Sequence, residues 1–203
     1  MNRRTVLRTL GGSTLTVGTA GCLGRQLSGS ASDRHTTTSS ETLRIVRVVD
    51  SDATPDEVDA TLAATVRRAD VTSEHTAMLR VEFTNRTEAS ATYTFGDYPP
   101  FTAFRSVESD PGVLLLDPDR TYERPSPTCW RPSNSPSLGA DGLAKQVALD
   151  SEESVHRDVE LWGTPEQSGE ACLPTGTFRF ENRYDFEGTD PFVWGFSVEI
   201  VAP

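Results

Sequence analysis

The feature that most constrains this chain is an alternation of apolar and polar side chains, which begins near Leu43 and returns in short runs to the end of the sequence. Residues 77–87, AMLRVEFTNRT, show it most clearly, since Leu79, Val81 and Phe83 are each followed by a polar residue. Successive side chains of a β-strand point to opposite faces of a sheet. The run is therefore predicted to be a strand with one face in the core and the other in water.

Nine further runs have apolar residues at strand spacing and are separated by residues typical of turns. They cover residues 43–50, 61–71, 90–96, 102–108, 112–117, 144–150, 154–162, 176–186 and 192–201. Many short strands without a convincing amphipathic helix indicate an all-β fold, and we expect an antiparallel two-sheet β-sandwich over residues 43–203. One competing element is a helix over residues 54–70, where Thr54 could cap the first turn and Pro55 could begin it.

Residues 1–21 have the composition of an export signal. A positively charged start is followed by residues 9–21, an uncharged run of 13 residues, whereas a membrane-spanning helix needs about 20 apolar residues. A short apolar run after a charged start is typical of a signal peptide. The pair Arg3 and Arg4 resembles a twin-arginine export signal, although Val6 stands where Phe is usual. The alternative is a basic N-terminal helix that stays on the protein.

Cys22 closes this run in the sequence TAGC, residues 19–22. Small residues before a cysteine resemble the cleavage site of a lipoprotein, in which the cysteine becomes the new N-terminus and carries the lipid. Thr19 replaces the usual Leu, and a plain loop cysteine is the alternative. A lipid chain contributes about 0.8 kcal/mol per buried methylene, and one chain binds a membrane only marginally. We therefore expect at least two chains on Cys22, holding the protein on the outer face of the cell membrane.

Residues 22–42 are expected to connect the lipid to the folded domain as a disordered linker. In residues 27–42, nine of the sixteen side chains are Ser or Thr. Such a segment buries too little apolar surface to offset the entropy lost on ordering. The expected organisation is a signal peptide at 1–21, a lipidated N-terminus and linker at 22–42, and a β-sandwich at 43–203.

The charge of the chain excludes one class of partner. The sequence has 30 Asp and Glu against 19 Lys and Arg, which gives a net charge of −11. Binding to a nucleic acid needs clustered cations, so no nucleic-acid partner is expected. Lys145 is the only lysine, and this acidic, lysine-poor composition resembles that of haloarchaeal proteins. An acidic protein adapted to ordinary salt is the alternative.

The other two cysteines lie in predicted loops. Cys129 is within residues 117–143, where five prolines exclude a regular strand or helix, and Cys172 lies in the loop 163–176. Outside the cell these two cysteines are expected to form a disulfide. It would constrain the unfolded chain by about 4 kcal/mol in the entropy model. Two free thiols or a metal pair are alternatives, although two cysteines without neighbouring histidines make a poor zinc site.

A disulfide would brace the proline-rich loop against the end of the sheet. Tyr122, Trp130 and Arg131 then become candidates for an exposed binding surface, because aromatic residues and Arg dominate binding hot spots. The alternative is that Trp130 packs over the end of the sandwich as a plug. A braced proline-rich loop also resembles the loops that protease inhibitors present, although nothing in residues 125–130 specifies a protease.

Catalytic and metal-binding patterns are weak. Ser154, His156 and Asp158 alternate on one predicted strand, but neighbours on one face are about 6.6 Å apart, too far for a hydrogen-bonded triad. The histidines, which include His35 and His75, show no spacing that suggests a metal site. We therefore expect no enzyme activity, no cofactor and no bound metal.

Two further patterns involve surface chemistry. Residues 50–59 carry four aspartates spaced as in a calcium loop but lack its glycine and terminal glutamate, so a solvated acidic turn is favoured over a calcium site. Asn85, in the sequence NRT, is the one N-x-S/T position without proline. Its place between a strand and a turn makes it a candidate for glycosylation.

Three stretches, residues 79–87, 149–163 and 176–200, carry a resemblance to known proteins. They resemble the immunoglobulin-like domains of secreted haloarchaeal lipoproteins. The chain departs from antibody domains because Trp130 directly follows Cys129 instead of lying between paired cysteines in the core. Most of those domains have no assigned activity, so the resemblance implies the architecture and not the role. Our leading hypothesis is a non-catalytic binding module that faces outward, with a surface protein or glycan as its partner. A structural component of the cell envelope without a discrete ligand and, less favoured, an inhibitor-like loop are the alternatives.

Overall fold

A computed structural model of the chain describes residues 40–107, 109–137 and 143–203. These residues belong to one compact unit, Thr38–Pro203. The predicted export signal with Arg3 and Arg4, the lipid site Cys22 and almost all of the predicted linker lie outside the described residues.

The described residues form ten strands and one short 3-10 helix, and no α-helix. The elements are β1 (Arg44–Ser51), β2 (Ala60–Arg68), β3 (Asp70–Val71), β4 (Met78–Asn85), β5 (Ala91–Phe95), β6 (Val113–Leu116), β7 (Lys145–Leu149), β8 (Ser154–Gly163), η1 (Glu170–Cys172), β9 (Gly176–Tyr184) and β10 (Phe192–Val201). The predicted all-β class is confirmed.

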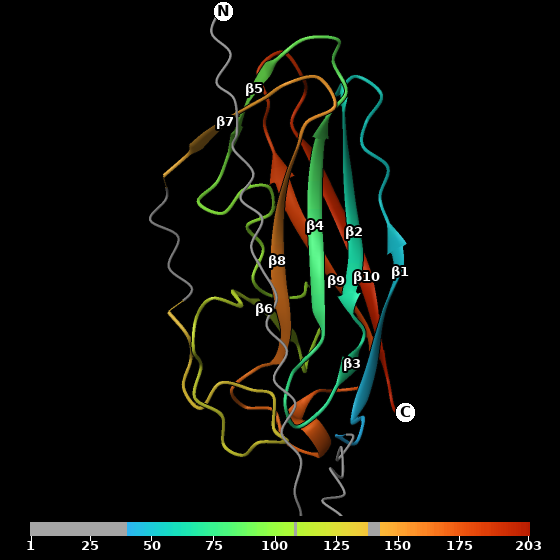
Figure 1. The fold of residues 1–203 in the computed structure, drawn as a ribbon, viewed down its shortest axis with the longest axis vertical. Coiled ribbons are helices and arrows are strands. Elements are labelled where there is room, and N and C mark those ends of the chain that lie inside the picture. Colours follow the sequence, from blue (N-terminus) through green and yellow to red (C-terminus); the bar gives the residue numbers. More distant parts are fainter. Residues whose placement is uncertain (1–39, 108, 138–142) are drawn as a thin grey trace, which may run out of the picture. The chain divides into compact units, whose positions relative to one another are not determined.

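Two antiparallel four-stranded sheets pack face to face, so the predicted β-sandwich is also confirmed (Figure 1). One sheet has the order β3-β1-β10-β9, and the other has the order β2-β4-β8-β6. A separate ladder, β5-β7, lies beside them. Strand β6 pairs with β8 only over Glu160–Gly163, so the first half of β8 has a neighbouring strand only on its β4 side within the described chain.

The structure excludes one alternative considered from the sequence and corrects one expected strand. The helix considered over residues 54–70 is wrong, because Ala60–Arg68 is the extended strand β2, paired along its length with β4. The strand predicted over 102–108 is reduced to two isolated bridges, Arg105 with Leu114 and Val107 with Arg179.

The alternation seen in the sequence places the core. Leu79, Val81 and Phe83 on β4 are fully buried, as the period of two predicted. Opposite them, Trp194 and Phe196 on β10 are also fully buried. Burial of large aromatic side chains at roughly 25 cal/mol per Å² of apolar surface is the main favourable term for a domain of this kind.

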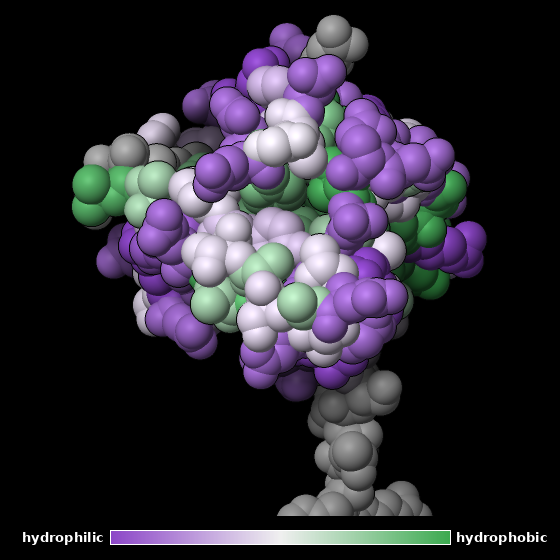
Figure 2. Space-filling model, turned by 90° about the horizontal axis from the view of Figure 1, so that it is seen from above, coloured by the Kyte–Doolittle hydropathy of each residue, from purple (hydrophilic) through white to green (hydrophobic). Residues whose placement is uncertain are grey.

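The loops gather at the two ends of the sandwich. The disulfide end comprises residues 40–43, the β3–β4 loop 72–77, the β8–β9 loop 164–175 and the part of the long loop around Cys129. The Asn85 end comprises the turns 52–59, 86–90, 150–153 and 185–191 (Figure 1). Seen from above, the molecular surface is mostly hydrophilic, with scattered apolar residues (Figure 2). No helix among the described residues is long and apolar enough to cross a membrane.

Candidate functional site: the Arg157 cleft

The predicted disulfide is confirmed. Cys129 in the long loop and Cys172 in η1 are bonded, with their Cα atoms 4.8 Å apart, which is an ordinary separation for a disulfide. The backbone around the bond is also paired, because the Trp130 amide donates to the Ala171 carbonyl at 2.8 Å and the Gly163 amide donates to the Trp130 carbonyl at 2.8 Å. The loop is thus fixed to the disulfide end at several points.

Trp130 is not an exposed binding residue, so that prediction is wrong for its central member. The side chain is 5% exposed, and its indole nitrogen donates to the Thr72 carbonyl. Its ring lies 5.1 Å from that of Trp162, and the Arg124 guanidinium lies 3.9 Å above it. A large apolar ring with one satisfied N–H gains more from burial than from exposure. The alternative, a plug over the end of the sandwich, is the observed arrangement.

The two residues predicted to join Trp130 serve the same packing. Tyr122 is half-buried and its ring lies 5.4 Å from that of Trp162. Arg131 donates through Nη1 to the carbonyls of Pro132 and Pro165. Tyr122 and Arg131 therefore hold loops together, which leaves the disulfide end without the aromatic recognition surface that the sequence suggested.

Asn85 is fully buried, so its predicted accessibility for glycosylation is wrong. Its Nδ2 donates to the carbonyls of Ala89, Leu149 and Asp150 at 3.0 to 3.1 Å. A glycosyl transfer to Nδ2 would need access to a nitrogen whose protons already face these acceptors. Asn85 of the N-x-T pattern therefore makes structural hydrogen bonds and is not an exposed acceptor for a glycan.

The Oδ1 atom of Asn85 completes the arrangement. It accepts from the Thr87 amide at 3.0 Å, from the Thr87 hydroxyl at 2.9 Å and from the Tyr93 hydroxyl at 2.8 Å. One side chain therefore ties the β4–β5 turn, strand β5 and the β7–β8 turn together. A buried amide whose hydrogen-bonding groups are all paired contributes far more to the stability of the fold than an exposed amide does. The loss of any partner would leave a buried polar group unsatisfied.

The other tested patterns are also used for structure. Asp158 makes a two-point ion pair with Arg80 at 2.7 and 2.8 Å, and this pairing lowers the pKa of Asp158. Ser154 shares a hydrogen bond with Thr84 at 2.7 Å. In the acidic turn, Asp52 is bonded to Arg179. Among the described residues, no group of three or more His, Cys, Asp or Glu side chains is placed to hold a metal ion.

The sequence interpretation missed Arg157. In β8 the inward positions alternate, and Arg157 stands between Val155 and Val159 at a position where the pattern calls for an apolar residue. It is only 9% exposed. An Arg at the apolar phase of an otherwise regular strand was the available signal, because charged side chains are rarely this buried unless they are paired.

The Arg157 guanidinium is held by a carbonyl and two rings. Nη1 donates to the Phe101 carbonyl at 2.7 Å, and the guanidinium carbon lies 4.6 Å from the centre of the Tyr98 ring and 5.2 Å from that of Phe104. Nη2 is buried without a hydrogen-bond partner in the described part of the chain. Burial lowers the pKa of Arg157, and the nearby charge of Asp117 opposes that shift. The group nevertheless stays charged, since an arginine pKa lies far above neutral pH.

Three cations surround Tyr98. Besides Arg157, the Nζ of Lys145 lies 5.7 Å from the ring centre, and Arg120 Nη2 donates to the Tyr98 hydroxyl at 3.3 Å. This gathering is unusual for a chain with a net charge of −11, and it includes the only lysine. Three cations at one ring attract anions, and the aspartates Asp97, Asp117, Asp119 and Asp158 line the cleft beside them.

A cleft of about 390 Å³ opens beside these residues. It is lined by Asp97, Tyr98, Pro99, Asp117, Pro118, Asp119, Lys145, His156, Arg157 and Asp158. A smaller void of about 10 Å³, the size of one water oxygen, also touches Arg157, between Tyr98, Phe104 and residues of the long loop. The larger cleft is within the range that small-molecule sites occupy.

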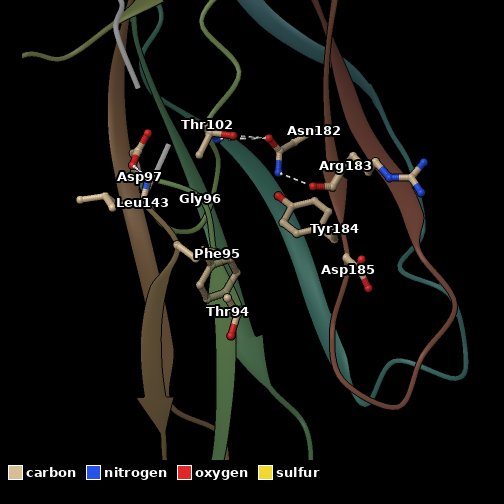
Figure 3. A pocket seen from close by; sticks show the side chains of 11 residues that line it. Thr94, Phe95, Gly96, Asp97, Thr102, Leu143, Asn182, Arg183, Tyr184 and Asp185 are labelled. Carbon is tan, nitrogen blue, oxygen red and sulfur yellow. Dashed lines mark hydrogen bonds between the residues drawn. The ribbon is translucent and has the colours of Figure 1, made fainter. Parts of the chain in front are cut away.

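A second cleft, of about 420 Å³, shares Asp97 with the first (Figure 3). Several of its polar side chains are bonded to the protein: the Thr102 hydroxyl donates to Asn182 Oδ1 at 2.5 Å, and Asp97 Oδ1 accepts from the Leu143 amide at 2.8 Å. The buried Tyr184 hydroxyl donates to the Pro100 carbonyl at 2.9 Å, and burial raises its pKa. Figure 3 shows Arg183 pointing away from this cleft. The first cleft therefore offers the stronger binding chemistry.

No known protein-family model, curated protein or solved structure matches this chain.

Proposed function

We propose that this protein is a lipid-anchored protein on the outer face of the cell membrane and that its β-sandwich is a non-catalytic binding module. The sequence TAGC around Cys22, behind the pair Arg3 and Arg4, supports the anchor. The disulfide between Cys129 and Cys172 is consistent with an oxidising location. The Arg157 cleft supports the binding role.

The observation that carries the binding role is the Arg157 guanidinium, buried without a carboxylate within ion-pair distance among the described residues. Taking a cation out of water costs several kcal/mol, and apolar side chains of similar volume are often at least as stabilising. Stability alone therefore gives little reason for an arginine at an inward position of β8. A ligand whose charge compensates that of Arg157 would explain the arginine at this position.

The described chain enters the sandwich away from the cleft. The chain joins the sandwich at the disulfide end, where the Leu43 amide donates to the Val71 carbonyl at 2.7 Å and Arg44 forms an ion pair with Glu170 at 3.0 Å. Arg157 lies in the half of β8 nearer the Asn85 end. The cleft is thus away from the point where the linker would pull the domain toward the membrane.

A structural component of the cell envelope is the second candidate function. The observation in its favour is that Tyr122, Trp130 and Arg131 are all used to hold loops together. A component of this kind would need a rigid domain and no ligand. The loss of one surface cation would then have the same effect as the loss of another.

The anchor is tested in cells that express the full chain and a Cys22→Ser variant. We expect the mass of the mature N-terminal peptide to show a lipid on Cys22 and the variant to leave the membrane fraction. An unmodified peptide beginning at Met1 in a cytoplasmic protein would contradict the anchor.

The binding role is tested on the same cells with a cross-linker that does not react with amines, because Lys145 is the only lysine and its loss would otherwise remove the reactive group. Lys145 is exposed and lines the cleft, so Lys145→Gln removes a cleft cation without disturbing the core. Arg47→Gln removes an exposed cation from β1, on the other sheet, and serves as the matched control. Cross-linked species that weaken in Lys145→Gln alone support the binding module. Species that are equal in both variants support the structural role instead.

A further inference from the structure

The charge of the Arg157 cleft calls for an anion. The Arg157 guanidinium and the Lys145 ammonium both lie over the Tyr98 ring, and Arg120 is bonded to its hydroxyl. Among the described residues, none of these three cations has a carboxylate within 4 Å, whereas Arg80 and Arg179 have such partners. Asp117 acts on Arg157 only through its nearby charge, so an anion in the cleft would supply a hydrogen-bonded partner that Arg157 Nη2 lacks in the described chain.

The geometry of Arg157 favours a carboxylate. Nη1 has two protons and gives one to the Phe101 carbonyl, while both Nη2 protons have no acceptor in the described chain. The two Nη2 protons are therefore available to a carboxylate oxygen, which is a strong acceptor for a guanidinium. The void of about 10 Å³ beside Arg157 has room for one such oxygen.

The rim of the cleft limits the charge of the ligand. Asp97, Asp117 and Asp119 line it together with the cations. Several like charges at close range are unfavourable, so a polyanion would be repelled where a single carboxylate is accepted. The volume of about 390 Å³ suits a small molecule.

We propose that this cleft binds a small molecule with a single carboxylate, whose oxygens accept hydrogen bonds from Arg157 and lie near Lys145. The proposal rests on the binding role proposed above and names its ligand class. Arg157 anchors the carboxylate, Lys145 adds long-range attraction, and the acidic rim excludes ligands with several negative charges.

The test is a titration of the full chain with acetate at constant ionic strength, followed by the side-chain ¹⁵N resonances of Arg157. We expect a saturable shift with acetate and none with acetamide, which has the same shape without the charge. Glucuronate and N-acetylalanine, two larger carboxylates, show whether a sugar acid or an amino-acid derivative binds more tightly. Tripolyphosphate is expected to bind more weakly than acetate because of the acidic rim.

Variants give the expected magnitudes. Lys145→Gln should weaken acetate binding by about three- to tenfold, as expected for the loss of one nearby, solvent-exposed charge. Arg47→Gln should leave it unchanged. Arg157→Gln should abolish binding, and Lys145→Gln provides the same test if Arg157→Gln does not fold.

Two results would overturn the proposal. One is the lack of a saturable shift at Arg157 with any of the carboxylates. The other is equal binding of acetate and tripolyphosphate, which would make the site a general anion patch. A lipid on Cys22 together with a negative titration would support the lipid anchor and refute the carboxylate ligand. A positive titration of a protein without lipid on Cys22 would support the ligand and refute the anchor.

Discussion

At the disulfide end a long proline-rich loop is held by one covalent bond and a buried tryptophan, whereas at the Asn85 end two turns and strand β5 are held by one amide side chain. Both ends bury aromatic rings next to their fastening. Trp130 packs on Trp162 at 5.1 Å, and Phe83 packs on Tyr93 at 4.6 Å and on Phe186 at 5.5 Å. The two ends of the sandwich are therefore closed by different chemistry, a disulfide at one end and a hydrogen-bonded amide at the other.

The two ends differ in what the loss of the disulfide or of Asn85 does to the protein. A disulfide acts chiefly by restricting the unfolded chain, so its loss lowers stability without leaving polar groups stranded. Asn85 acts in the folded state, where it satisfies three carbonyls and three donors. Its loss leaves several buried groups without partners at once.

Removal of the disulfide should have the largest effect. In Cys129→Ser with Cys172→Ser, the unfolded chain regains the freedom of a loop of 43 residues, and the free energy of unfolding should fall by about 4 kcal/mol. Denaturant unfolding of both proteins measures it. A loss below about 1 kcal/mol would mean that Trp130 and its hydrogen bonds close this end by themselves.

Asn85→Ala should lower the free energy of unfolding by about 3 kcal/mol, because the Tyr93 hydroxyl and three carbonyls lose their partner together. The matched control is Thr87→Ala, which destroys the N-x-T pattern but keeps the amide, and should lose about 1 kcal/mol or less. If the Thr87 variant isolated from its native cells loses more mass than the substitution itself removes, Asn85 carries a glycan and its burial is refuted.

Tyr93→Phe should have a smaller effect, about 1 kcal/mol, measured in the same unfolding experiment. It removes one donor to Asn85 Oδ1, which keeps its two bonds from Thr87, and it leaves the aromatic packing intact. A loss as large as that of Asn85→Ala would show that the hydroxyl, and not the amide, organises this end.

The smallest effect is expected between the ends, at the ion pair of Arg80 and Asp158. The Arg80 guanidinium lowers the pKa of Asp158, so the pair stabilises the fold at pH values above the ordinary aspartate pKa. This contribution, small for a pair near the surface, should disappear as the pH falls through the lowered pKa of Asp158. Comparison of wild type with Arg80→Gln at pH 7 and at pH 2 measures it. An equal difference at both pH values would contradict the assignment.

The period-two pattern predicted most of the fold because it depends only on neighbouring residues. Leu79, Val81 and Phe83 pointed to a buried face, and that face is buried. The pairing of Cys129 with Cys172 could also be predicted without coordinates, because the two cysteines are expected to lie outside the cell, where cysteines usually pair.

The sites were harder to predict because burial at the ends depends on loops that are distant in the sequence. Asn85 resembles an exposed acceptor until the turn at Asp150, 65 residues away, covers it. Trp130 resembles an exposed anchor until Thr72, 58 residues away, accepts its N–H. Arg157 did break the local pattern, and an arginine at an inward strand position was the one available sequence signal for the cleft.

The most direct test of the Arg157 cleft is a crystal structure of the protein grown with a monocarboxylate. The account predicts a carboxylate oxygen at about 2.8 Å from Arg157 Nη2, with Lys145 nearby. A structure in which Asp117 instead turns to form an ion pair with Arg157 would contradict it, because the buried charge would then be a structural feature with no need of a ligand.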